Sequence, residues 1–248
     1  MPVLSEISTR SPKELDKQDT KEKTEKLLLR LAELQPLLFA EGKHAVLVIL
    51  QGMDASGKDG AVNKVFSSIN PMGVSVKPFK QPTEEELKHD FLWRIHQNAP
   101  ERGMIKIFNR SHYEDVLVTR VHGLIDDETA RKRFDAINHF EELLAKHNST
   151  RIFKFYLHIS KEEQQERFKE REQIKSKEWK FNKQDLIEAS YWDKYMEMYE
   201  DVFKYCNEYP WMIVPADQNW YKEYLIAKTI VEDLENLNMK YPSLKEKP

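Results

Sequence analysis

The sequence predicts a three-layer α/β/α fold, in which a five-stranded parallel sheet lies between two layers of helices and carries a helical lid. Apolar runs of strand length alternate with segments of helical periodicity, which is the element order of a parallel sheet. The runs are almost continuously apolar, as in strands that are buried on both faces. A glycine-rich loop joins the first run to a helical segment, as in folds that bind anions at a helix start.

The first residues are polar and include prolines, and we expect a flexible arm over residues 1–20. A helix is predicted from Thr20 to Ala40, with a kink at Pro36 near its end. Its leucines recur at helical spacing: Leu27, Leu28, Leu31, Leu34, Leu37 and Leu38. Residues 21–248 are predicted to form a single domain.

Strand and helix candidates alternate through the rest of the chain. The apolar runs with strand length are Ala45–Leu50, Val74–Phe79, Met104–Phe108, Ile152–Ile159 and Trp211–Val214. The predicted helices are Ala61–Ile69, Glu84–Gln97, Asp126–His147, Lys161–Arg171, Lys183–Asn207 and Tyr221–Asn238. Aromatic residues repeat at helical spacing between Tyr191 and Tyr199, which indicates a core or subunit-interface stripe before a base-stacking surface.

Composition excludes several classes of protein. The 248 residues carry a net charge of −3, so overall charge gives no case for nucleic-acid binding. The longest apolar run, Ala45–Leu50, is too short for a membrane span, and the first 25 residues contain no apolar stretch typical of a secretory signal. Cys206 is the only cysteine, which suits a reducing compartment. We therefore expect a cytoplasmic protein without membrane or nucleic-acid partners.

The most informative segment is the loop from Gly52 to Gly60, which follows the first predicted strand. Three of the seven glycines fall within these nine residues, at the spacing of a phosphate-binding loop. Glycine allows the backbone to fold around an anion, and the following helix start adds partial positive charge. Lys58 adds a full charge and is a candidate catalytic residue. The expected phosphate contacts come from Gly52, Ala55, Ser56, Gly57, Asp59 and Gly60.

This loop departs from the common pattern, in which lysine is followed by a magnesium-binding serine or threonine. Here Asp59 follows the lysine, and a second acid, Asp54, lies inside the loop. A carboxylate would repel the bound phosphates unless a divalent cation lies between them. Asp54 is therefore predicted to bind Mg²⁺, with Mn²⁺ as the second candidate; the alternative is that both acids are merely solvated.

A second cluster of polar residues, Asn109 to Asp115, begins where the third predicted strand ends. Ligands bind at this edge of an open α/β sheet. Arg110 is expected to direct its planar guanidinium toward phosphate. Asn109 and Glu114 are candidate metal ligands, with Asp115 as a substitute; alternatively, Asn109 caps the next helix and Glu114 is solvated.

The segment 167–183 is unusually basic and is predicted to be a lid that closes over phosphates. Arg167 and Arg171 are its candidate phosphate ligands. This segment contains seven basic residues and three glutamates, which gives a local net charge of +4. The alternative is a solvent-exposed charged surface with Glu–Lys pairs. The eight histidines show no zinc spacing, and His112 could contact substrate or carry a phosphoryl group, although local packing is the stronger interpretation.

These motifs together resemble the polyphosphate kinase 2 family, over about residues 27–242. The matching stretches are GMDASGKDG (residues 52–60), FNRSHYEDVL (108–117), LHISKEEQ (157–164), WKF (179–181) and PADQNWY (215–221). The resemblance implies a P-loop kinase fold in which Asp54 and Lys58 belong to the catalytic loop. It also implies that Arg110 holds phosphates, that Arg167 and Arg171 belong to the lid, and that the protein is a homo-oligomer, either a dimer or a tetramer.

Many members of this family carry Asp where this chain has Asn109, so metal ligation by Asn109 is open. The Asn-Arg-Ser-His-Tyr-Glu-Asp version resembles the subgroup that phosphorylates both nucleoside mono- and diphosphates. The implied reaction transfers the terminal phosphoryl group of polyphosphate to ADP or AMP, reversibly and with Mg²⁺. Adenine and guanine nucleotides are the expected acceptors or products.

Such a transfer needs no strong general base, because the attacking phosphate oxygen is already deprotonated near neutral pH. The main obstacle is repulsion between two polyanions, which Mg²⁺ and the basic side chains offset. We therefore expect direct in-line transfer. Two alternatives remain: an ATP-dependent nucleoside monophosphate kinase of the thymidylate kinase type, and a P-loop nucleotide sensor without catalysis. Asp59 in place of the magnesium-binding hydroxyl argues against the first, and the basic lid argues against the second.

Overall fold

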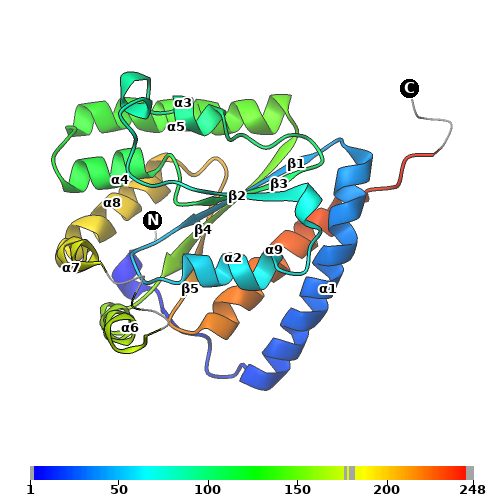
Figure 1. Cartoon of the computed structure of the whole chain (residues 1–248), viewed down its shortest axis with the longest axis horizontal. Coiled ribbons are helices and arrows are strands. Elements are labelled where there is room, and N and C mark those ends of the chain that lie inside the picture. The colour runs from blue at the N-terminus through cyan, green and yellow to red at the C-terminus, as the bar shows by residue number, and fades with distance from the viewer. Residues whose placement is uncertain (1–2, 176–177, 179–181, 244–248) are drawn as a thin grey trace.

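The computed structural model describes residues 3–175, 178 and 182–243. Its sheet has five strands, all parallel, in the order β2-β3-β1-β4-β5. Helices cover both faces of this sheet (Figure 1). The predicted three-layer α/β/α fold with a five-stranded parallel sheet is therefore confirmed. In the part of the chain that is described, no helix is long and apolar enough to cross a membrane.

All five predicted strands are present, with ends that differ from the prediction by at most two residues. They are β1 (Ala45–Gln51), β2 (Val74–Pro78), β3 (Ile105–Asn109), β4 (Thr150–His158) and β5 (Trp211–Pro215). Every residue of the central strand β1 is buried, because helices close off both faces of the sheet. Parallel pairing aligns the carboxyl ends: Leu50 lies beside Asn109, and Gln51 lies beside Tyr156. Loops that leave the central strands therefore meet at one edge.

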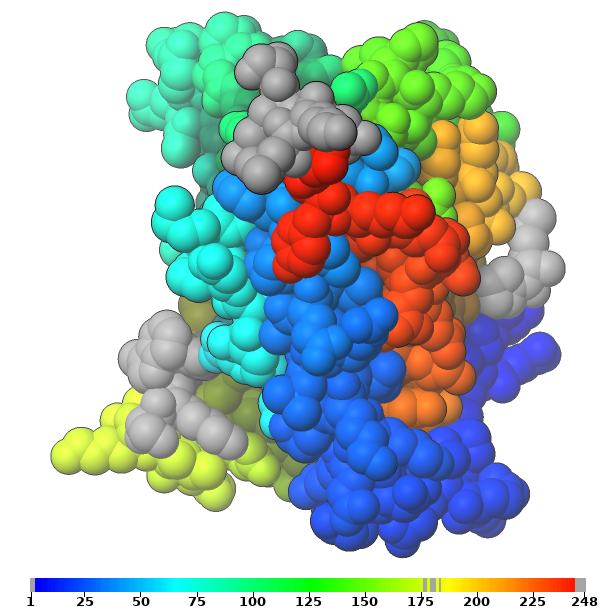
Figure 2. All heavy atoms as spheres, turned by 90° about the vertical axis from the view of Figure 1, so that its right-hand side faces the viewer, coloured from blue at the N-terminus to red at the C-terminus, as the bar shows by residue number. Residues whose placement is uncertain are grey.

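The helices form two groups on the two faces of the sheet (Figure 1). Their bounds are α1 (Lys17–Glu41), α2 (Lys58–Phe66), α3 (Trp93–His96), α4 (Glu114–Val121), α5 (Asp127–His147), α6 (Lys161–Gln173), α7 (Lys183–Ser190), α8 (Trp192–Tyr205) and α9 (Asn219–Asn236). Helix α9 packs against α1 and α2 on one face, and α4 packs against α5 and α8 on the other. Figure 2 shows α1 and α9 lying side by side on the surface.

Two predicted helices are interrupted, and one helix was missed. In place of a helix over 84–97, the chain forms the 3₁₀ turn η3 (Glu86–Lys88) and the single-turn α3, because Asp90 accepts a hydrogen bond from the Leu92 N–H and starts a new turn. The predicted helix 183–207 divides at Tyr191, where the backbone leaves helical geometry. Helix α4 was not among the predicted helices; a helix here entered only through the alternative in which Asn109 caps it, and its N-cap residue is instead Tyr113. The aromatic stripe of α8 packs in the core of the same chain, with Tyr195 and Tyr199 buried.

The prediction of a flexible arm over residues 1–20 needs correction for the described residues. Helix α1 begins at Lys17, and residues 4–11 are anchored on the domain. Leu4 is buried at 1% exposure and its N–H donates to Glu200 Oε1 at 2.8 Å. Thr9 donates to Asp217 at 2.8 Å, and the Ser11 N–H donates to Gln218 Oε1 at 2.9 Å. An apolar anchor and these hydrogen bonds offset the entropy of ordering the arm.

Candidate active site

The glycine-rich loop connects β1 to α2 at the carboxyl edge of the sheet. Gly52 has φ +147°, and a Cβ there would lie 2.7 Å from the Leu157 carbonyl oxygen, so a larger residue does not fit. Ala55 has φ +62°, a left-handed conformation that costs a non-glycine residue about 1–3 kcal/mol. The loop is therefore held in a specific curved shape by its surroundings.

Lys58 is the first residue of α2, and its side chain binds the backbone of the loop. Its Nζ donates to the carbonyl oxygens of Gly52 at 2.7 Å and Met53 at 3.1 Å. Burial, together with the charge of the nearby Arg110 guanidinium, lowers the pKa of Lys58 to about 8. The ammonium is thus fixed at the loop by backbone carbonyls, and no described carboxylate is its hydrogen-bond partner.

Two further cations bind the loop's backbone from outside. Arg167 of α6 donates to the carbonyl oxygens of Ala55 at 2.9 Å and Ala216 at 2.8 Å. Lys222 of α9 is fully buried; its Nζ approaches the Gly57 carbonyl oxygen at 3.2 Å and the Asn219 side-chain oxygen at 2.9 Å. Burial, reinforced by the Arg167 charge, lowers the pKa of Lys222 to about 7.

Arg110 faces the loop from the turn after β3. Its guanidinium is bound by Asp54 from the loop, and by Glu114 at 3.0 Å from α4. The Glu114 carboxylate raises the pKa of Arg110, so the side chain is permanently charged. Arg110 itself has φ +63°, a conformation that places its side chain at the loop.

A buried polar network holds the turn that follows Arg110. Lys154 of β4 donates to Glu141 at 2.7 Å and to the Tyr113 hydroxyl at 2.9 Å, and Tyr113 donates to Glu141 at 2.7 Å. His112 is fully buried against this carboxylate, with its Nε2 at 3.4 Å from Glu141. His112 therefore packs locally and does not open onto the loop. Each member of the network is hydrogen-bonded, which fixes the backbone on which Arg110 is mounted.

The predicted metal ligands divide into two groups. Asp54 and Glu114 approach the same guanidinium, so two hard oxygen donors converge at one place. Asn109 instead donates from its amide nitrogen to Asp59 at 2.8 Å, and Asp115 lies 3.3 Å from Arg94. Within residues 3–175, 178 and 182–243, no three His, Cys, Asp or Glu residues form a metal cage. The donors fit Mg²⁺, which takes one or two carboxylates and completes its shell with phosphate oxygens and water.

A cavity of about 560 Å³ lies over the loop and collects most of the predicted site, including Asp54, Lys58, Asn109 and Arg110. We call it the P-loop cleft. A second cavity of about 920 Å³, the α4 cavity, is lined by apolar residues such as Phe91 and Val118 and by the cations Arg94 and Arg133. Phe79, Lys80 and Arg110 line both cavities. Arg110 therefore stands where the two spaces meet.

The predicted lid is described only in part. Arg167 is fixed on the loop's backbone carbonyls and so acts as part of the loop's support. Arg171 lines the P-loop cleft and binds Asp185 of α7 at 2.9 Å, which links the two helices that flank the lid segment. The family-like residues Trp179, Lys180 and Phe181 lie outside the described residues.

Two residues that hold the loop were not predicted from the sequence. Gln164 donates from Nε2 to the Asp54 carbonyl oxygen at 2.9 Å, and Lys222 lies beneath Gly57. A signal for Lys222 was present: it shares a four-residue spacing with the buried Ile226 and Ile230, so a lysine stands on the apolar stripe of a helix. Lysines are almost never fully buried unless they are paired, so a lysine on such a stripe indicates a specific role for its charge.

Comparison with known proteins gives one consistent result. The family described as Polyphosphate kinase 2 (PPK2) matches residues 14–242. The chain is 51% identical to an AMP/ADP-polyphosphate phosphotransferase of Meiothermus ruber, over 86% of this chain and 80% of that protein. It is 45% identical to an ADP-polyphosphate phosphotransferase of Rhodopseudomonas palustris, over 86% and 78% of the two chains. The crystal structure of a polyphosphate kinase 2 from Arthrobacter aurescens aligns with a TM-score of 0.94 at 40% identity, covering 99% of this chain and 89% of that one.

Proposed function

This chain belongs to the polyphosphate kinase 2 family, and we propose how its site carries out phosphoryl transfer between polyphosphate and nucleotides. It is an enzyme, a polyphosphate:nucleotide phosphotransferase that acts on AMP or ADP, as its similar relatives are named. The observation that carries the proposed mechanism is the position of Arg110, between the P-loop cleft and the α4 cavity.

The two cavities suit different substrates. The P-loop cleft is lined by five cations, among them Lys58, Arg167 and Arg171, and by five carboxylates, so it suits a chain of phosphates that carries a divalent cation. The α4 cavity combines apolar walls with the cations Arg94 and Arg133, a combination that accommodates a nucleoside and its phosphates. The terminal phosphate of the donor and the acceptor phosphate then meet at Arg110.

Transfer is direct and in line, without a phosphorylated enzyme. The acceptor oxygen is already ionised near neutral pH, so the site must mainly bring two anions together and stabilise charge on the transferring group. Lys58 and Arg110 supply fixed positive charge at this place. His112, the histidine nearest to Arg110 in sequence, is fully buried and so poorly placed to carry a phosphoryl group.

We further propose that Mg²⁺ binds at Asp54 and Glu114, with Mn²⁺ as a substitute. When bound, the ion would neutralise phosphate charge at the reacting centre. Asp54→Asn should lower turnover and raise the Mg²⁺ concentration needed for half-maximal activity, by at least the roughly 10-fold that loss of an outer-shell partner costs. A magnesium titration of the variant and of Asp185→Asn, a carboxylate outside the donor pair, tests this. An unchanged titration in Asp54→Asn would place the ion elsewhere.

The central experiment is a turnover assay with purified protein, Mg²⁺ and long-chain polyphosphate, supplied with either AMP or ADP and no ATP. Formation of ADP or ATP, measured by anion-exchange chromatography, is the expected result. A protein that needs ATP to phosphorylate a nucleoside monophosphate would instead be of the thymidylate kinase type. Saturable binding without any product would indicate a sensor.

Other expected properties concern assembly, nucleotide range and location. We expect a homo-oligomer, a dimer or a tetramer, that works in the cytoplasm and accepts guanine as well as adenine nucleotides. The buried thiol of Cys206, the only cysteine, is compatible with a reducing compartment. Light scattering after size exclusion measures the assembly, and replacement of ADP by GDP in the turnover assay tests the base.

A further inference from the structure

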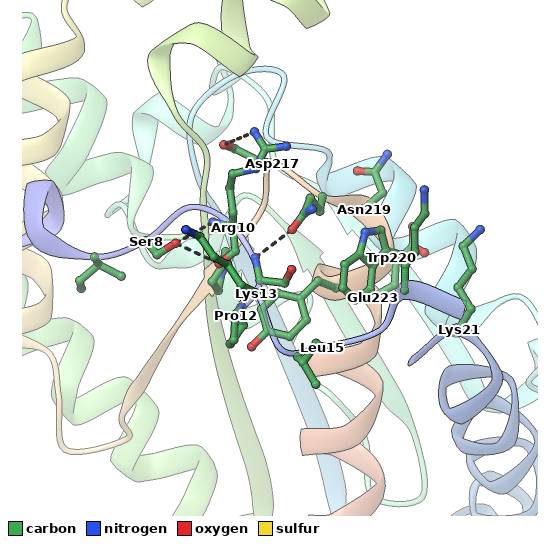
Figure 3. A pocket seen from close by; sticks show the side chains of 16 residues that line it. Ser8, Arg10, Pro12, Lys13, Leu15, Lys21, Asp217, Asn219, Trp220 and Glu223 are labelled. Atoms are coloured by element: carbon green, nitrogen blue, oxygen red, sulfur yellow. Dashed lines mark hydrogen bonds and ion pairs between the residues drawn. The ribbon is translucent and has the colours of Figure 1, made fainter. Parts of the chain in front are cut away.

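A third cavity, which we call the arm cavity, lies between the N-terminal arm and the start of α9. Its volume is about 1330 Å³, more than twice that of the P-loop cleft at about 560 Å³. Figure 3 shows Arg10 and Lys13 on the arm, Lys21 at the start of α1, and Trp220 and Glu223 on α9 around this space. The cavity exists because the arm is anchored at Leu4, Thr9 and Ser11 and crosses over β5 and α9.

Four of the six charged residues that line the arm cavity are basic. Arg10, Lys13, Lys17 and Lys21 all line it and are exposed. Within the described part of the chain, Lys13, Lys17 and Lys21 form no ion pair within 4 Å. The charge of Lys21 acts at longer range on the Glu223 carboxyl, where it lowers the pKa against the larger effect of burial. Concave surfaces lined by one sign of charge concentrate ligands of the opposite sign.

The two acids of the cavity contribute less charge to its surface. The Asp217 side chain is only 3% exposed and is bound by the Ser160 N–H at 2.8 Å and by the Thr9 hydroxyl at 2.8 Å. Glu223 is half-buried, and burial raises the pKa of its carboxyl. Four exposed cations therefore face one covered and one half-covered carboxylate.

Helix α9 points its first turn at the same space. The first turn of this 18-residue helix contains no acidic residue, and its N-cap residue, Gln218, makes no side-chain cap because its Oε1 accepts the Ser11 N–H instead. The partial positive charge of the helix start is thus added to that of the lysines. Anions are the ligands that such a combination favours.

The three cavities lie in a fixed order. Arg110, Phe79 and Lys80 line both the α4 cavity and the P-loop cleft, whereas Asp217 and Asn219 line both the P-loop cleft and the arm cavity. The P-loop cleft is therefore in the middle. If the transferring end of polyphosphate meets the nucleotide at Arg110, the rest of the donor must leave the cleft away from the α4 cavity.

We propose that the arm cavity binds the distal phosphates of a long polyphosphate donor, so that the N-terminal arm sets a preference for long chains. This inference rests on the function proposed above, in which the donor occupies the P-loop cleft. A donor of a few phosphates ends within the cleft and does not reach the lysines of the arm. A long chain reaches them and gains their contacts as well.

The test is the variant Lys13→Ala/Lys17→Ala/Lys21→Ala, assayed with long-chain polyphosphate and with tetrapolyphosphate. Loss of three exposed contacts to phosphate should raise KM for the long chain about tenfold, with KM for tetrapolyphosphate and both kcat values within about twofold of wild type. The slope of log KM against log salt concentration should decrease by about 2 for the long chain. Each of the three lost contacts should contribute about 0.7 to this decrease, by analogy with single-stranded nucleic acids.

The control is Lys23→Ala/Lys26→Ala/Lys132→Ala, which removes the same charge from exposed lysines outside the cavity. It should leave the ratio of the two KM values unchanged. The inference would be overturned by an equal rise in KM for both donors, by no rise in KM for either donor, or by the same rise in the control. In each of these cases, wild-type turnover with polyphosphate would still support the proposed function. Wild-type protein that uses neither donor would instead refute the proposed function itself. Circular dichroism with thermal unfolding verifies that all variants fold.

Discussion

The loop side and the β3 side of the P-loop cleft hold their positive charge in different ways. On the loop side, Lys58 and Lys222 donate to backbone carbonyl and amide oxygens, which carry no net charge. On the β3 side, Arg110 is bound by two carboxylates, and Arg171, which reaches the cleft from α6, is bound by a third. At pH values below the lowered pKa values of Lys58 and Lys222, the loop side therefore presents charge that is not paired with a described carboxylate. The charge of Arg110 and Arg171, in contrast, is neutralised until a substrate competes for it.

The positive charge of the loop is therefore in place before the substrate binds. Uncompensated buried cations are unfavourable in the free protein, as the lowered pKa values of Lys58 and Lys222 express. A bound phosphate removes that penalty, so part of the binding free energy comes from relief of a charge imbalance. Arg110 and Arg171 contribute less free energy to phosphate binding, but they can exchange their carboxylate partners for phosphate as the reaction proceeds.

The largest effect should come from Lys58→Ala. Loss of a fixed charge at the reacting centre should lower kcat by roughly 10²-fold or more, because that charge stabilises the transferring phosphoryl group. Steady-state turnover with polyphosphate and ADP measures this. Lys64→Ala removes a lysine from the exposed face of the same helix and should retain normal turnover. Near-normal activity of Lys58→Ala would contradict the central role of the loop side.

A smaller effect is expected from Lys222→Met, which keeps the length of the side chain and removes its charge. KM for polyphosphate should rise roughly tenfold with a lesser change in kcat, since the charge acts through the loop and not on the transferring group. Thermal stability should be unchanged or higher, because an unpaired buried charge has been replaced by an apolar group. Lower stability with unchanged KM would reduce Lys222 to a structural role.

The smallest effect concerns pH. The pKa of Lys58 is lowered to about 8 by burial and by Arg110, with Asp54, Glu114 and Asp59 opposing that shift, so the amine loses its proton as pH rises through this value. The charged form binds phosphate, and kcat/KM, which reports the free enzyme, should therefore fall about twofold by pH 8 and more steeply above it. A pH profile between 6 and 9.5, with Lys222→Met as a parallel series, tests the assignment. A kcat/KM that increases over this range would contradict it.

Local patterns in the sequence predicted the fold and the centre of the site. Continuous apolar runs located all five strands, and glycine spacing located the loop, because both depend on residues adjacent in the chain. Long-range contacts were less accessible. The contact of Lys222 with Gly57 spans 165 residues, and the contact of Arg167 with Ala55 spans 112. No local pattern states that α6 and α9 meet at one loop.

The errors have similar causes. The arm was expected to be flexible because its composition is polar, whereas its anchoring depends on Asp217 and Gln218 near the other end of the chain. Metal ligation by Asn109 stays a prediction; long-range packing also decides its hydrogen bond, since its amide nitrogen donates to Asp59 of α2. Periodicity suggested helices over 84–97 and 183–207 without revealing the side-chain hydrogen bonds and local backbone turns that interrupt them.

The approach of Lys222 to Gly57 also constrains how this enzyme can be changed. A Cβ at position 57 would lie 2.3 Å from Lys222 Nζ, and the φ of +90° there already disfavours side chains. The backbone strain at position 57 remains whatever the space around it, and shortening residue 222 would relieve only the contact with Nζ. We therefore expect a laboratory selection to retain Gly57 even in variants that have lost the lysine.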